Sequence, residues 1–156
     1  MTISIFDGQS GFDIKYSYQK SGFRNMYWSL LGNYSYTKTE NLGQSIFVNE
    51  GTQLSYVPFH KLNQQIKLSL RSFNFIWHYQ FVGKRFVNAD NSQSLSPYHL
   101  NHFKVAYSSY RLPFNASAQI NNLFNVEYES TLVHPMPLRN FSITINYNLN
   151  HLKKLW

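Results

Sequence analysis

The sequence contains no cysteine, which excludes disulfide bridges and thiolate metal sites. It also has no run of about 18 consecutive apolar residues, the length that a membrane-spanning helix needs. The most apolar segment, Phe73–Val82, is interrupted by Asn74, His78 and Gln80. Charge is scarce as well, because only 13% of residues are charged, where a soluble domain usually has about 25%. These absences exclude a transmembrane helix and argue against an ordinary soluble surface.

Aromatic side chains make up 18% of the chain, although its mean hydropathy of −0.38 is that of a soluble protein. Strands that cross a membrane give such values, because only alternate residues contact lipid. The net charge of +7 comes from 14 basic and 7 acidic residues and suggests a nucleic-acid partner as one alternative. The basic residues are scattered, however, and their only adjacent pairs are Lys84-Arg85 and Lys153-Lys154. A phosphate-binding surface needs a cluster, so the sequence argues against nucleic acid.

Strict alternation of apolar and polar residues is the strongest pattern, and it is clearest at residues 141–150. A strand places every second side chain on one face, whereas a helix would distribute them around its axis. We therefore expect a strand there, with a convex lipid-facing side and a concave side. The lipid-facing set is Phe141, Ile143, Ile145, Tyr147 and Leu149, and the concave set is Ser142, Thr144, Asn146 and Asn148. Residues 12–19 repeat the pattern near the start of the chain.

Five further segments alternate less cleanly, and each has about the 9–11 residues that a tilted strand needs to cross a bilayer. They are Met26–Tyr36, Leu62–Leu70, Phe73–Phe81, His99–Tyr107 and Phe114–Leu123. Together with the two segments above they predict seven strands, and Ile3–Phe6 is a candidate remnant of another.

The predicted connections alternate between tight and long. The tight ones are Gln19–Asn25, Arg71–Ser72 and Ser108–Pro113, and the long ones are Thr39–Phe59, Gly83–Pro97 and Asn125–Pro137. Short periplasmic turns and long outer loops are typical of outer-membrane barrels. A soluble β-sandwich is the alternative, but its strands usually have only about 5–6 residues. The predicted fold is an all-β, antiparallel transmembrane β-barrel meander of about seven strands, forming an incomplete, open segment of a barrel.

Several short motifs then resemble the C-terminal end of TonB-dependent outer-membrane receptors. They are YVPFHKLN at 56–63, FVGKR at 81–85, NADN at 88–91, LSPY at 95–98, NLFNVEY at 122–128 and PMPLRNF at 135–141. Gly11-Phe12-Asp13 stands where the family has a G-x-E strand start, and the middle motifs resemble Bacteroidetes-type members. The resemblance covers nearly the whole chain. Leu138 departs from it, because the family has Gly at that place.

The resemblance implies energised uptake of a scarce nutrient, such as a ferric siderophore, cobalamin or a similar complex, across the outer membrane of a Gram-negative cell. It implies as partners the outer-membrane lipid, a plug domain, further barrel strands and TonB. The plug and the TonB-contacting segment have no counterpart in this chain, and Met1–Phe6 is not a signal peptide. We therefore expect residues 1–150 to be the C-terminal segment of a larger barrel, of about 22 strands, and unable to transport alone.

Two alternatives and the tail complete these expectations. An independent eight-stranded outer-membrane barrel with a structural or adhesive role would have close to this length. An enzyme would need an assembled nucleophile, base and orienting group, and no such motif occurs, so none is predicted. Residues 151–156 break the alternation, and we expect this tail outside the sheet, with Trp156 at the periplasmic interface.

No catalytic, cofactor-binding or metal-binding residue is predicted, and no ligand-contacting residue is assigned. Four basic residues, expected to face the barrel lumen because lipid exposure would cost about 2–4 kcal/mol each, are Lys15, Lys67, Arg71 and Lys104. His99 and His102 are three apart and fall on opposite faces of a strand, so they do not chelate together. His60 marks the start of a strand, and Glu127 and Glu129 lie where a loop begins. The loops expected to contribute to a ligand site are 41–53, 88–96 and 130–135.

Overall fold

The computed structural model describes residues 2–5, 10–22, 26–39, 52–108 and 113–147. Within these ranges the chain has strands and loops, and no helix is long and apolar enough to span a membrane. Eight strands form one antiparallel sheet. They are β1 (Thr2–Ile5), β2 (Ser10–Ser21), β3 (Met26–Lys38), β4 (His60–Leu70), β5 (Phe73–Val82), β8 (Tyr98–Ser108), β9 (Phe114–Asn121) and β12 (Asn140–Tyr147).

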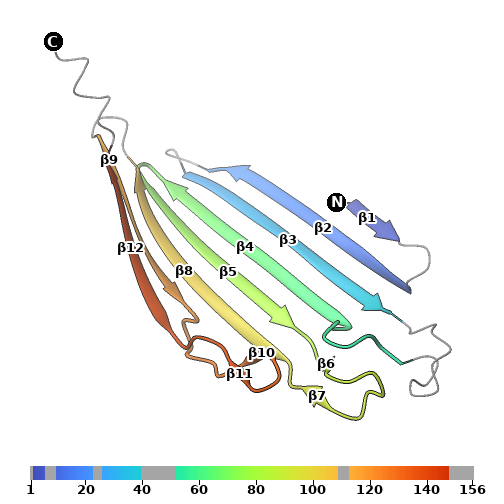
Figure 1. Ribbon diagram of the computed structural model, residues 1–156. Coiled ribbons are helices and arrows are strands. Elements are labelled where there is room, and N and C mark those ends of the chain that lie inside the picture. The colour runs from blue at the N-terminus through green and yellow to red at the C-terminus, as the bar shows by residue number, and fades with distance from the viewer. Residues whose placement is uncertain (1, 6–9, 23–25, 40–51, 109–112, 148–156) are drawn as a thin grey trace.

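Each of these eight strands pairs with the one that precedes or follows it along the chain, so their order in the sheet is β1-β2-β3-β4-β5-β8-β9-β12 (Figure 1). The predicted all-β antiparallel meander of seven long strands is therefore confirmed, and the short β1 lies where a remnant was expected. In the described residues the sheet is open, with β1 at one edge and β12 at the other. An independent closed barrel of eight strands is not favoured by this topology.

Most strands begin and end within two residues of the predicted positions. The prediction was two residues too long at the end of β9, which stops at Asn121. The reason is local, because Asn122 has a φ of 50° and turns the chain out of the sheet. The last strand is described as far as Tyr147, so the predicted positions 148–150 lie outside the described residues, as does the tail at 151–156.

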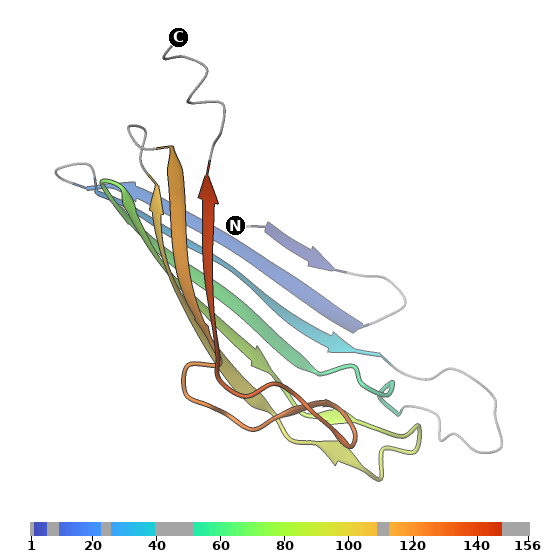
Figure 2. The ribbon, with the colours of Figure 1, turned by 60° about the vertical axis from the view of Figure 1, so that its left-hand side comes forward.

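Among the fully described connections, the tight β4–β5 turn lies at one end of the sheet and the long β5–β8 and β9–β12 loops lie at the other (Figures 1 and 2). The β4–β5 connection is the tight turn Arg71–Ser72, with Leu70 paired to Phe73. Two long loops contain small antiparallel pairs that the sequence did not predict. One is β6 (Arg85–Phe86) with β7 (Ser94–Leu95), and the other is β10 (Glu129–Thr131) with β11 (His134–Pro135). Of the loop predicted at 41–53, only its last two residues lie within the described ranges.

The register places most apolar residues of the seven long strands on one face. Paired Cα positions share a face of a sheet, and one such row crosses from β2 to β12. This row is Tyr18, Leu30, Ile66, Trp77, Phe103, Ile120 and Phe141. The next row, on the opposite face, is Gln19, Ser29, Lys67, Ile76, Lys104, Gln119 and Ser142. The two predicted sets in β12 are thus confirmed on opposite faces as far as Tyr147.

Candidate functional site

The polar face of the sheet carries most of the charged strand residues. Lys15, Lys67 and Lys104 lie on it, as predicted, because their Cα partners are polar-face residues of the neighbouring strands. Lys61 shares this face, and Asp13 is the only carboxylate on it among the described strand residues. Arg71 forms the β4–β5 turn with a φ of 53° and has no cross-strand partner, so its orientation toward the lumen stays a prediction. The face therefore has a net positive charge.

The polar face is also the hollowed one. Three shallow hollows lie over the sheet, and polar-face side chains make up most of the lining of each. The first lies at Lys15, Asn33 and Asn63, the second at Gln19, Ser29 and Lys67. The third spans β4, β5, β8 and β9 around two histidines. This agrees with the predicted concave side, since the inner wall of a barrel is the side that curves around space.

The two histidines in the third hollow are His78 and His102, which are direct partners across β5 and β8. Their rings stack with centroids 5.5 Å apart at an interplanar angle of 25°. His99 lies on the other face, where its ring stacks on Phe81, so the predicted separation of His99 from His102 is confirmed. His60 begins β4, as expected, and its Nδ1 lies 2.7 Å from the Tyr34 hydroxyl. The described residues hold no group of three or more histidine, aspartate or glutamate side chains suited to a metal ion.

Asn122 shapes the loop after β9. It is 2% exposed, its Nδ2 donates to the carbonyl oxygen of Val126, and its Oδ1 accepts from the Val126 amide, both at 2.8 Å. Asn125 also has a positive φ, of 55°, and its Oδ1 accepts from the Arg139 amide at 2.9 Å. Asparagine tolerates this conformation better than most residues and can bond the nearby backbone. Both asparagines of the NLFNVEY motif therefore stabilise the fold of this loop through hydrogen bonds to its backbone.

A second asparagine joins two other long loops. Asn91 has a φ of 59°; its Oδ1 accepts from the Gln53 amide at 2.9 Å and its Nδ2 donates to the Gln53 carbonyl at 2.8 Å. The side chain of Gln53 is buried and its amide group is fully bonded. Its Nε2 donates to the Thr37 carbonyl at 3.1 Å and its Oε1 accepts from the Thr39 amide at 2.9 Å. The β3–β4 and β5–β8 loops are therefore fastened to each other at the loop end of the sheet.

Arg85 fastens the β5–β8 loop to the β9–β12 loop. Its side chain is only 4% exposed, and Nη2 donates to the Glu129 carbonyl oxygen at 2.7 Å while Nη1 donates to the Gly83 carbonyl at 3.2 Å. The guanidinium carbon lies 4.9 Å from the centre of the Tyr98 ring. Tyr98 also contacts Tyr128, and the centroids of the two rings are 4.6 Å apart.

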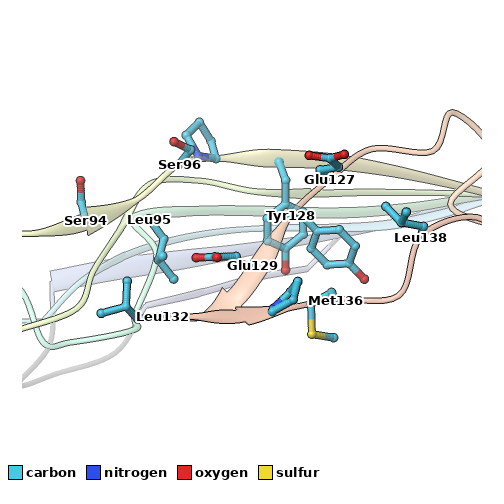
Figure 3. A pocket seen from close by; sticks show the side chains of 12 residues that line it. Ser94, Leu95, Ser96, Glu127, Tyr128, Glu129, Leu132, Met136 and Leu138 are labelled. Carbon is cyan, nitrogen blue, oxygen red and sulfur yellow. The ribbon is translucent and has the colours of Figure 1, made fainter.

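A pocket opens between these two loops, next to the tyrosine pair (Figure 3). In the view of Figure 3, Leu95 and Leu132 lie toward one end and Leu138 at the other, with Tyr128 and Glu129 between them. Burial raises the pKa of the Tyr128 phenol, so its hydroxyl remains protonated and able to donate at neutral pH. With Glu127 also lining it, the pocket combines apolar walls, aromatic rings and two carboxylates. Such a lining can hold an amphipathic molecule that carries hydrogen-bond donors.

The loops predicted to bind ligand contribute unequally to this pocket. Ser94, Leu95 and Ser96 line it from the predicted range 88–96, and Leu132 and Pro135 line it from 130–135. Arg85, Tyr98 and Tyr128 were not predicted as site residues, although each lies within a quoted motif. The sequence around each of them does not indicate a site, because the contacts that bring the three residues together join separate loops.

A family model described as TonB dependent receptor-like, beta-barrel, matches residues 9–123. No curated protein matches the chain at the level of sequence. The narrower resemblance to Bacteroidetes-type members stays a prediction.

Two solved receptors share the fold. BauA, the ferric preacinetobactin receptor of Acinetobacter baumannii, superposes with a TM-score of 0.68 at 21% identity, over 89% of this chain and 22% of the receptor. FyuA, the ferric yersiniabactin uptake receptor of Yersinia pestis, gives a TM-score of 0.60 at 14% identity, over 88% of this chain and 21% of the receptor. The chain therefore spans about a fifth of the length of each. At these identities the likeness shows a common fold.

Proposed function

The chain belongs to the TonB-dependent receptor-like β-barrel family, and we propose that it forms part of the wall of an outer-membrane receptor for energised nutrient uptake. The substrates proposed are a ferric siderophore, cobalamin or a similar complex. In this proposal the chain acts as a transporter component and not as an enzyme.

The observation that carries the proposal is the division of the sheet into an apolar and a polar face across seven long strands. Aromatic contacts gather toward both ends of the apolar face. At the loop end Phe12 lies 5.7 Å from Tyr36, and at the turn end Phe73 lies 5.2 Å from Tyr107, measured between ring centroids. An apolar band flanked by aromatic girdles is the outer surface expected of a membrane barrel.

The open edges support the view that this wall is completed by other strands. In a membrane, unpaired backbone groups cost several kcal/mol each, on the order of the penalty for any unsatisfied polar group. We propose that the edges at β1 and β12 are covered by further barrel strands, and that a plug domain fills the lumen and contacts TonB. The 156 residues alone would then have neither a closed pore nor energy coupling, and would not transport.

Within this receptor, the pocket between the β5–β8 and β9–β12 loops is proposed to lie on the route of the ligand. It lies at the loop end of the sheet, which is the outer side in this family of barrels. Its two tyrosines and two glutamates, together with leucines and Met136, suit a large amphipathic chelate with donor groups.

The test is uptake of radiolabelled ferric siderophores and cobalamin by cells that depend on this protein, with and without collapse of the proton-motive force. At least one member of the panel should be taken up, and only by energised cells. Tyr128→Ala should lower that uptake by about tenfold or more, in the range of a central aromatic contact.

Tyr18→Ala is the matched control, because Tyr18 is 57% exposed and lies on the apolar face toward the other end of the sheet. Its uptake should equal that of the parent. Equal uptake by the Tyr128 and Tyr18 variants would remove the pocket from the ligand route, and a panel without any energised uptake would contradict the receptor proposal.

A further inference from the structure

The hollow around His78 and His102 has a composition that favours one sign of ligand charge. Its lining includes Gln65, Lys104, Gln119 and Asn121 beside the two imidazoles, and it includes no carboxylate. Lys67 is also on this face, since it pairs with Ile76, which in turn pairs with Lys104. Asp13, the described carboxylate of this face, is on β2, three strands from β5. A cation in this hollow would face ammonium groups with no counter-charge, so the electrostatics favour an anion.

The contacts of His102 Nδ1 orient the ring and leave Nε2 for a ligand. The Asn122 backbone amide donates to Nδ1 at 3.4 Å, which requires an unprotonated Nδ1 in the neutral ring. Asn121 Oδ1 lies 3.2 Å from the same atom and can accept from it when the ring is protonated. Asn121 is itself held, since Gln119 Nε2 donates to its Oδ1 at 2.6 Å and its Nδ2 donates to Asn140 Oδ1 at 2.8 Å. The chain Gln119–Asn121–Asn140 thus orients the ring of His102.

With Nδ1 accepting from the Asn122 amide, the neutral ring carries its proton on Nε2 and can donate one hydrogen bond to an anion. Uptake of a second proton, at Nδ1 beside Asn121 Oδ1, makes the ring cationic and turns that bond into a charge-assisted one. His78 stacks against the same ring, and its protonation in the absence of an anion would place two like charges side by side.

We propose that this hollow binds an oxyanion, a carboxylate or a phosphate group, between His78, His102 and Lys104, with binding coupled to protonation of the imidazoles. The charged groups facing the pair are Lys104 on β8 and Lys67 on β4, while β9 and β12 present Gln119, Asn121, Asn140 and Ser142. All of these are neutral or positive, so an anion is the missing counter-charge. The inference rests on the polar-face geometry and would survive a failure of the uptake assay.

The oxyanion could come from a free anion in the lumen or from an acidic side chain of another part of the protein. The experiment is a calorimetric titration in which inorganic phosphate is added to the purified protein, in the form its cells produce. It is done at about pH 5.5 and about pH 7.5, on either side of the ordinary histidine pKa. For a free anion, phosphate should bind about tenfold more tightly at the lower pH, as expected for a charge-assisted hydrogen bond.

Two variants give this result its specificity. Lys104→Met should weaken phosphate about tenfold, whereas Lys15→Met, on the same face in another hollow, should leave it unchanged. The double variant His78→Gln/His102→Gln keeps amide donors but has no imidazole to protonate, so it should lose the preference for the lower pH. Phosphate gains negative charge between the two pH values, so the double variant should bind it equally well or more tightly at the higher one.

If an internal carboxylate fills the hollow, phosphate should not bind to the parent protein. Lys104→Met should then lower the melting temperature more at about pH 7.5, where fewer imidazole charges remain to pair with the carboxylate, than at about pH 5.5, and Lys15→Met should not. Absence of both signatures would overturn the proposal. Tight binding of Zn²⁺ that needs both histidines, without any effect of phosphate, would overturn it in favour of a cation site.

Discussion

Arg85 and Glu129 are 44 positions apart in the sequence, yet Nη2 of Arg85 donates to the backbone carbonyl oxygen of Glu129 at 2.7 Å. The bond joins two loops that belong to different pairs of strands, and β10 packs beside β7 at the same place. Because the acceptor is a backbone atom, the contact depends on the path of the β9–β12 loop and not on the acidic side chain. The proposed ligand pocket is therefore built on an arginine that does not line it.

Arg85→Met should loosen both loops, because it removes two hydrogen bonds to carbonyl groups while keeping an apolar stem over Tyr98. Hydrogen bonds of charged groups are worth about 1.5–3 kcal/mol, so amide exchange in 83–97 and 127–136 should become at least about tenfold faster. Lys84→Met is the control, since Lys84 is exposed. Unchanged exchange in the Arg85 variant would contradict the role of this contact.

Asn122→Ala should destabilise the start of the same loop by about 1–3 kcal/mol, the cost of leaving a partly buried Val126 amide without a partner. Asn122→Gly keeps the backbone freedom that a φ of 50° requires and isolates the loss of the side-chain bonds. Denaturant unfolding in detergent should rank the proteins as parent, Gly variant, Ala variant. A Gly variant as stable as the parent would show that only the backbone conformation matters.

Neighbouring substitutions in β12 test which face contacts lipid. Ile143→Lys places a charge on the apolar face and should cost about 2–4 kcal/mol near the bilayer centre, whereas Thr144→Lys places it on the polar face at little cost. Folding yield in lipid vesicles, read from heat-dependent mobility in gels, should fall for the first variant only. The opposite ranking would mean that the two faces are assigned the wrong way round.

Gly32 lies under the ring of Tyr16, its cross-strand partner on the apolar face. A Cβ atom at residue 32 would overlap the Tyr16 ring, so Gly32→Ala should destabilise the protein by about 1 kcal/mol as the ring is displaced. In a Tyr16→Ala background the same change should be neutral or favourable. A double-mutant cycle should give a coupling of at least about 0.5 kcal/mol, and additive effects would contradict the packing.

Val133 has a φ of 62° and is 76% exposed in the β10–β11 turn. The left-handed conformation costs an L-residue about 1–2 kcal/mol, and the exposed side chain makes little compensating contact. Val133→Gly should therefore slow proteolytic cleavage of this hairpin several-fold. Val133→Ala retains a Cβ atom and should gain less. Faster cleavage of the Gly variant would show that the valine side chain stabilises the turn.

Much of the architecture follows from local properties of the sequence. The alternation at 141–147 indicates both a strand and its two faces, because side-chain direction in a strand depends only on odd or even position. The tight turn at Arg71–Ser72 and the long loops follow from where the alternation stops. Small errors arose where a single side chain ended a strand, as Asn122 does after β9.

The contacts that make a site were decided by the tertiary structure alone. The sequence spacing shows that His99 and His102 lie on opposite faces, but the pairing of β5 with β8 selects His78 as the partner of His102. The buried Arg85 likewise looks like any other basic residue until the β9–β12 loop supplies its acceptor. Alternation is set within one strand, whereas register and loop docking depend on segments far apart in the chain, so no local pattern encodes them.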